Sequence, residues 1–156
     1  MTQDARFEDG REAPLNLGAL DADDLAVISS LVQDAVFPAS EMRWDRKANR
    51  FALLLNRVRW EDQGKTRHAP ERVQSVLIFQ TVQGVASQDV PKGDVDTVLS
   101  LLSLSFEETD APSGFLTLTF AGDGAIRLKV EAIDVSLKDV TRPYAAPSRK
   151  LPQHPD

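Results

Sequence analysis

The chain has 156 residues, a formal net charge of −6 at pH 7 and no cysteine. A chain of this length buries enough apolar surface to fold as one domain without disulfides. Its negative charge argues against broad, non-specific binding to nucleic acids, and no apolar run approaches the length of a membrane-spanning helix. Because cysteine is absent and the first residues show no basic stretch followed by an apolar run, we expect a cytoplasmic protein.

The N-terminal part of the chain predicts an arm, a short strand and a helix. Residues 1–13 mix charged residues with glycine and are expected to form a flexible arm. Residues 14–20 are typical of an edge strand, where a leading proline is tolerated. Asp21 is placed to cap a helix that Pro38 closes. The apolar residues of this helix recur with helical spacing: Leu25, Ile28, Leu31, Val32 and Ala35.

The next segment changes to the period of two that is typical of β-strands. A strand that includes Trp44, a turn over residues 45–49 and a strand that begins at Phe51 together predict a β-hairpin. A polar loop over residues 61–70 follows. It leads into a long strand over residues 72–90.

The second half of the chain is expected to repeat this order. Asp94 is a candidate N-cap for a short helix over residues 95–102, but the same residues also fit the start of the strand that follows. The sequence leaves these two alternatives open. Residues 115–120 are rich in β-prone side chains, and residues 122–124 predict a tight turn before a last strand that begins at Ala125.

In both long strands, the apolar residues change from even-numbered to odd-numbered positions along the strand. In the last strand, the apolar residues up to Val130 use one parity and those from Ile133 onward use the other. Val82 and Val85 show the same change in the first half. Because a straight strand cannot place both sets on one face, we expect a β-bulge, or a passage between two packing environments, near Ala132.

A constant offset of fifty residues places residues 76–78 on residues 126–128 and continues along both strands. We therefore predict an α+β fold of two αβββ repeats, or βαβββ repeats if the first strand is counted. The repeats are expected to be related by a pseudo-twofold axis, with the helices packed on one side of a mostly antiparallel sheet. The first repeat is expected to cover residues 14–91 and the second residues 92–144.

The C-terminal residues 145–156 are expected to form a proline-rich tail. The segment from Thr141 onward holds four of the nine prolines of the chain. Such a composition favours an extended, polyproline-like conformation over a helix.

Few residues of this sequence are suited to catalysis or metal binding. The two histidines, His68 and His154, lie in a charged loop and near the C-terminus, and there is no cysteine, so we expect no metal site and no cofactor. No serine lies in the context of a nucleophile elbow. The carboxylates over residues 107–110 are interpreted as solvated turn residues, and we expect no catalytic residue among them.

The most informative chemical feature is a basic segment between Arg43 and Arg72. It contains seven arginines and two lysines against four carboxylates. Arginines beside aromatic residues are suited to phosphate contact, base stacking or an acidic patch on a partner protein. The candidate binding residues are Arg43, Trp44, Arg57, Arg59 and Trp60. The sequence leaves open whether the two tryptophans lie in the core and whether the arginines pair with carboxylates of the same chain.

Three stretches of the chain resemble those of a known family: residues 15–31, residues 43–56 and residues 137–144, the last with the sequence Leu-Lys-Asp-Val-Thr-Arg-Pro-Tyr. They resemble an uncharacterised alphaproteobacterial family, the domain of unknown function DUF2948. The resemblance implies a bacterial cytosolic setting, but no activity and no functional residues. The order of the expected elements is also similar to that of one domain of a DNA sliding clamp, a similarity of order alone that does not fix function.

We consider two functions from different classes. The first is a non-enzymatic binding or assembly module that contacts an anionic ligand or a protein partner through the basic segment, the proline-rich tail or both. The alternative is a small cytosolic enzyme of unrecognised type. An enzyme should show a deep pocket with converging polar groups, whereas a binding module should show a shallow basic or apolar patch. Nucleic acid is disfavoured as a partner, no membrane contact is expected, and the sequence does not decide between a monomer and a homo-oligomer.

Overall fold

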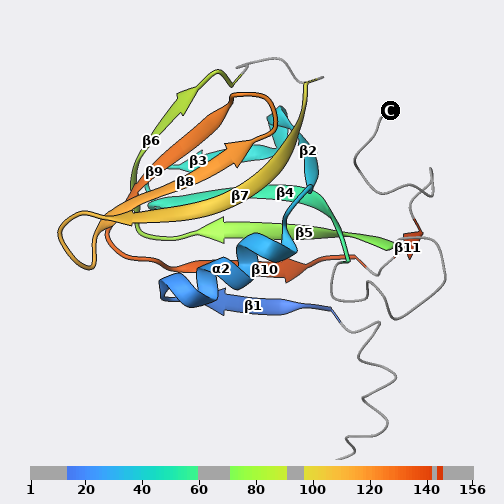
Figure 1. Cartoon of the computed structure of the whole chain (residues 1–156), viewed down its shortest axis with the longest axis horizontal. Helices are drawn as coiled ribbons and strands as arrows, with labels where there is room; N and C mark the ends of the chain where they lie inside the picture. Colours follow the sequence, from blue (N-terminus) through green and yellow to red (C-terminus); the bar gives the residue numbers. More distant parts are fainter. Residues whose placement is uncertain (1–13, 60–70, 91–96, 142–143, 146–156) are drawn as a thin grey trace, which may run out of the picture.

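A computed structural model describes residues 14–59, 71–90, 97–141 and 144–145 (Figure 1). These residues form one long antiparallel sheet, which folds over into two layers. The first layer contains, in spatial order, β1 (Asn16–Ala19), β10 (Val135–Asp139), β5 (Glu71–Phe79), β4 (Arg50–Val58) and β3 (Met42–Asp45), and β11 (Tyr144–Ala145) also pairs with β5. The second layer contains β7 (Val98–Glu108), β8 (Gly114–Phe120), β9 (Ala125–Val130) and β6 (Val82–Gln88).

The two layers are joined on one side by β2 (Val36–Pro38), which pairs with both β4 and β7. On the other side, two long strands bend from one layer into the other. Strand β5 continues as β6, and β9 continues as β10. Because β5 pairs with β10 and β6 pairs with β9, both strands bend at the same corner of the molecule.

Thr81 lies at this corner, with a φ of 57° that is rare for a β-branched residue. Its hydroxyl donates a hydrogen bond to the carbonyl of Ala132 (3.0 Å), and its own carbonyl accepts one from the N–H of Glu131 (3.1 Å). The N–H of Gln80 donates to the carbonyl of Asp134 (2.9 Å). The predicted change of packing environment near Ala132 is confirmed, because the strand passes there from the second layer into the first.

An apolar core fills the space between the layers. Alternate residues of the central strands point into it, as the period of two predicts. On β4 and β8 these residues are Phe51, Leu53, Leu55, Leu116, Leu118 and Phe120. Phe37 on β2 packs edge-on against Phe120, with 5.8 Å between ring centroids, and so ties the joining strand to the second layer. Each such side chain contributes about 1.5–3 kcal/mol when fully buried.

Helix α2 (Ala22–Leu31) contacts β1 and β7 and thereby covers one side of the sandwich. The predicted cap is confirmed, because Oδ1 of Asp21 accepts a hydrogen bond from the N–H of Asp24 (2.8 Å). The helix ends seven residues before Pro38, earlier than predicted. The chain turns at Asp34, whose φ of 65° is incompatible with a continuing helix, and then enters β2.

The predicted α+β fold of two αβββ repeats is wrong. The described residues are mostly antiparallel strand, with α2 and a 3-10 turn over Ala39–Glu41, so no set of helices packs on one side of the sheet. Of the two alternatives left open for residues 95–102, the structure shows the strand, because β7 begins at Val98, while residues 95 and 96 lie outside the described residues. Val98 and Leu102, which a helix would have buried, are 63% and 42% exposed. A register shift between Leu101 and Ser103 allows Leu101 and Leu104 to face the core from one strand.

The fifty-residue offset has a simpler explanation in this fold. It superimposes the strand that bends from β5 into β6 on the strand that bends from β9 into β10. In each of these strands, the side chains that face the core must change from one set of alternate residues to the other at the bend. The offset therefore matches a bend that the two strands share, and the described residues contain no second α-helix to complete a repeated helix-and-strands unit.

The predicted hairpins are confirmed, with turns over residues 45–49 and 121–124 joining β3 to β4 and β8 to β9. Three predictions concern residues that lie wholly or mostly outside the described part of the chain: the cap at Asp94, the arm expected over residues 1–13 and the tail expected over residues 145–156. The described part of the chain contains no helix that is both long enough and apolar enough to cross a membrane.

Candidate functional site

The four predicted binding residues that the structure describes, Arg43, Trp44, Arg57 and Arg59, do not form one exposed surface. Arg43 is exposed on β3, and the neighbouring Trp44 is half-buried and packs against the core. Arg57 and Arg59, on and just after β4, are 0% and 4% exposed. Trp60 lies outside the described residues.

Arg57 continues the row of core-facing residues on β4 and ends it with a charge. Its guanidinium donates hydrogen bonds to both carboxylate oxygens of Asp139 on β10: Nη2 lies 3.0 Å from Oδ1 and 3.2 Å from Oδ2, and Nε lies 3.3 Å from Oδ1. Its Nε also lies 3.1 Å from Oγ of Ser75 on β5. A charge is retained in a protein interior only where partners of this kind replace the lost water, so these three strands are held in register by one ionic cluster.

Asp139 extends this cluster to the edge of the first layer. Its Oδ1 accepts a hydrogen bond from the hydroxyl of Ser75 (2.7 Å), and its Oδ2 accepts one from the N–H of Leu15, just before β1 (2.9 Å). The side chain of Asp139 is 2% exposed. The carboxylate therefore has donors on both oxygens and serves as a structural junction.

Two further arginines of the basic segment also have partners within the chain. Arg59 donates to Oε1 of Glu71 at 2.8 Å, and Arg72 donates to both the side chain and the backbone carbonyl of Asn56. Arg72 is 8% exposed. The binding role of Arg57 and Arg59 stays a prediction, and in this structure both guanidinium groups are bound by carboxylates of the same chain.

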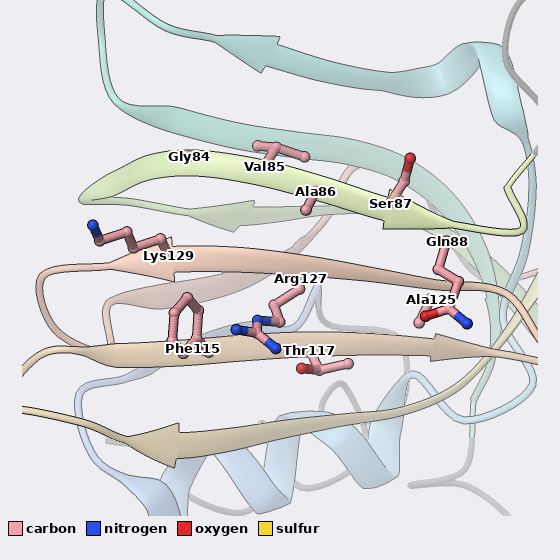
Figure 2. A pocket seen from close by; sticks show the side chains of 10 residues that line it. All are labelled: Gly84, Val85, Ala86, Ser87, Gln88, Phe115, Thr117, Ala125, Arg127 and Lys129. Carbon is pink, nitrogen blue, oxygen red and sulfur yellow. The ribbon is translucent and has the colours of Figure 1, made fainter.

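An open groove lies on the outer face of the second layer, over β6, β8 and β9 (Figure 2). Its volume is about 630 Å³. The groove is lined by Gly84, Val85, Ala86, Ser87, Gln88, Phe115, Thr117, Ala125, Arg127 and Lys129. Two of the smallest of these stand opposite the two cations across the β6–β9 pair, Gly84 opposite Lys129 and Ala86 opposite Arg127. The groove therefore has a low floor along β6 beside taller, basic side chains on β9.

Arg127 is held in place by an aromatic ring. Its guanidinium carbon lies 3.8 Å from the centroid of Phe115 on β8, close enough for a cation–π contact. Such a contact leaves the edge N–H groups of a guanidinium accessible to an acceptor. Figure 2 shows Arg127, Phe115 and Lys129 on the same face of the sheet. The groove thus presents one cation held by a ring, Arg127, and one more adaptable cation, Lys129.

The lining of this groove contains no carboxylate. Glu107 on β7 stands opposite Phe115, on the far side from Lys129, and Asp89 directly follows the lining residue Gln88. Glu131, just after β9, is bound by Nε2 of Gln83 (2.6 Å). The residues that line the groove therefore carry a positive charge, although the chain as a whole is acidic.

Sequence reasoning missed this groove because its two sides are distant in the chain. Arg127 and Lys129 alternate with buried residues on β9, and such a pattern is typical of any solvated strand face. The small residues that lower the floor belong to β6, about forty residues earlier. The only signal available was the absence of large or charged residues between Val82 and Gln88, and its meaning depends on the pairing of β6 with β9.

Residues suited to metal binding do not cluster in the described part of the chain. No group of three or more His, Cys, Asp or Glu side chains there could hold a metal ion.

The family model described as "Protein of unknown function (DUF2948)" matches residues 15–154. The chain belongs to this family. No curated protein and no solved structure is significantly similar to this DUF2948 domain. Its function must therefore be inferred from the geometry and charge of its own surfaces.

Proposed function

We propose that this DUF2948 domain is a non-enzymatic binding module that holds an anionic segment of a partner protein in the groove over β6, β8 and β9. The observation that carries the proposal is the pairing of two cations, Arg127 and Lys129, with a groove lining that contains no carboxylate. An anionic group in this groove gains charge-assisted hydrogen bonds, and the acidic residues beside the groove, Asp89, Glu107 and Glu131, lie outside its lining.

The shape of the groove favours binding over catalysis. Enzyme pockets enclose most of their ligand and bring several polar groups together at one point. This groove is open and follows a strand, and its two cations stand side by side along β9. An extended, acidic segment suits such a site better than a small substrate that must be surrounded. The setting we propose is the bacterial cytoplasm, which the lack of cysteine favours.

A second surface is favoured by a separate observation. The β3–β4 hairpin carries four exposed cations, Arg43, Arg46, Lys47 and Arg50. This hairpin is the solvated part of the basic segment. None of its residues lines the groove over β6, and Asp45 lies among its cations. We therefore rank it second as a site for an acidic partner.

The two surfaces can be distinguished with one peptide. The probe is a fluorescein-labelled peptide of about ten residues in which glutamate alternates with threonine, long enough to follow a strand. Fluorescence anisotropy measures its affinity for the wild type, for the groove variant Arg127→Gln/Lys129→Gln and for the charge-matched hairpin variant Arg43→Gln/Arg46→Gln. The groove variant should bind about tenfold more weakly, since each lost charge contact costs on the order of 0.5–1 kcal/mol.

The hairpin variant should bind within about twofold of the wild type, and the affinity of the wild type should fall with rising salt because the contacts are screened. The peptide with lysine in place of glutamate should not bind. A loss of affinity confined to the hairpin variant would move the site to β3–β4. If the acidic peptide does not bind the wild type, the proposed function is wrong.

A further inference from the structure

The sheet has two ends, β1 and β6, and they differ in how well they are protected. Exposed strand edges present unpaired N–H and C=O groups, which natural proteins usually shield with short strands, charges, proline or a covering helix. Strand β1 has four residues, follows Pro14 and contacts helix α2. Strand β6 has seven residues and carries neither proline nor a charged side chain.

Within the described residues, β6 pairs only with β9. Every second residue of β6 therefore directs its backbone N–H and C=O away from the sheet. The outer strand β3 provides a comparison, since it has four residues and two of them, Arg43 and Asp45, are exposed charges. The β6 edge has none of these protective features. Such an unprotected edge is typical of a strand that pairs with a further strand.

The groove lies along this same edge. Residues 84–88 of β6 form part of its lining, together with Arg127 and Lys129 of β9. A strand added to β6 would lie two strand spacings of about 4.8 Å each from β9. Its outward-facing side chains would cross above Gly84 and Ala86, which have almost no side chain to obstruct them. A long acidic side chain is then directed toward the two cations.

We propose that β6 accepts an acidic segment of a partner protein as an added β-strand, with a carboxylate on every second residue facing Arg127 and Lys129. This inference rests on the proposed function and adds the mode of recognition. Backbone hydrogen bonds to the β6 edge provide affinity, and the alternation of acidic side chains provides specificity. A second copy of this chain fits less well, because pairing two β6 strands brings the arginines and lysines of both copies onto the same face.

Strand addition is tested with N-methylated peptides. An N-methyl group removes a backbone donor and blocks one edge of a strand, and residues that share a side-chain face also share an edge. Two versions of the glutamate–threonine peptide are prepared, one methylated at the glutamates and one at the threonines. Their affinities are compared with that of the unmethylated peptide. Isotope-edited amide shifts of Gly84, Ala86 and Ser87 report whether β6 itself is engaged.

Strand addition predicts that one methylated version binds at least about tenfold more weakly and that the other retains most of its affinity, because only one edge faces β6. Strand addition would be overturned if both methylated versions bind the domain as tightly as the unmethylated peptide does. It would also be overturned if both versions lose affinity to the same extent. If the groove variant still loses affinity in either of these cases, the proposed function stands without this mode of binding. A stable dimer that excludes the peptide, detected by light scattering, would assign the edge to a second copy and also overturn the inference.

Discussion

Asp139 on β10 accepts hydrogen bonds on both of its carboxylate oxygens from the guanidinium of Arg57 on β4, across the intervening strand β5. Both side chains are almost fully excluded from solvent. The pair completes an otherwise apolar core face at one end of the first layer. Burying two charges is expensive, so the pair is tolerated only because Ser75 and the N–H of Leu15 supply the remaining hydrogen bonds.

Replacing Asp139 by Asn should destabilise the domain strongly. The substitution leaves the charge of Arg57 buried without an anion, which costs about 3–5 kcal/mol in comparable sites. The free energy of unfolding, measured by urea denaturation, checks this value. Asp123→Asn, at an exposed turn, is the control and should change stability by less than about 0.5 kcal/mol.

The double variant Arg57→Met/Asp139→Asn should be more stable than Asp139→Asn alone, because it removes the uncompensated charge. Equal stability of Asp139→Asn and the wild type would show that the pair contributes no more than a solvated contact.

Gly114 begins β8 at a point where the backbone of β7 approaches closely. A Cβ atom there would lie 2.5 Å from the ring of Phe106, and closer still to the carbonyl oxygen of Glu107. Gly114→Ala should therefore lower the free energy of unfolding by about 1–3 kcal/mol. Gly18→Ala is the matched control, since its Cβ would meet no atom nearer than 3.9 Å. A similar melting temperature for both variants would contradict the close approach of β7 and β8.

Leu102 distinguishes strand β7 from the helix that the sequence also permits. In the strand this side chain is at the register shift and 42% exposed, whereas Leu101 beside it is fully buried. Leu102→Ser should change stability by less than about 1 kcal/mol, and Leu101→Ala should cost about 2–5 kcal/mol. Thermal unfolding of the two variants checks the difference. The reverse order of stabilities is what a helix over residues 95–102 would produce.

Thr81 holds the corner where both long strands bend. Thr81→Val keeps the shape of the side chain but removes the hydroxyl that bonds Ala132, and the strained φ remains. Thr81→Gly also loses the hydroxyl but relieves the strain. We expect Thr81→Val to be the less stable of the two by about 1 kcal/mol, as measured by chemical denaturation. If Thr81→Val is the more stable variant, the strain at this corner is negligible.

Local features of this fold are predictable from the sequence, and the pairing of distant strands is not. The cap at Asp21 and the bend near Ala132 depend on neighbouring residues and are confirmed. The choice between helix and strand over residues 95–102 stays open in the sequence, because the leucines and valines there satisfy both the helical period and that of a strand with a bulge. Only pairing with β2 and β8 decides between them.

The candidate site shows the same limit. Arg57 was a reasonable binding residue in the sequence, because arginine is rarely buried. Its partner Asp139 is eighty-two residues away in the chain, and nothing local indicates that the two meet. Arg127 and Lys129 have the ordinary pattern of a solvated strand face. Their significance appears only when β6 places its smallest residues beside them.

The most direct test of the groove as the binding site is a map of amide chemical shifts for the whole domain during titration with the alternating glutamate–threonine peptide. We predict that the largest changes fall on residues 84–88 of β6 and on Thr117, Arg127 and Lys129, the residues that line the groove. The exposed hairpin over residues 43–50 should change little. Changes concentrated on that hairpin, or no saturable change at any residue, would contradict the account.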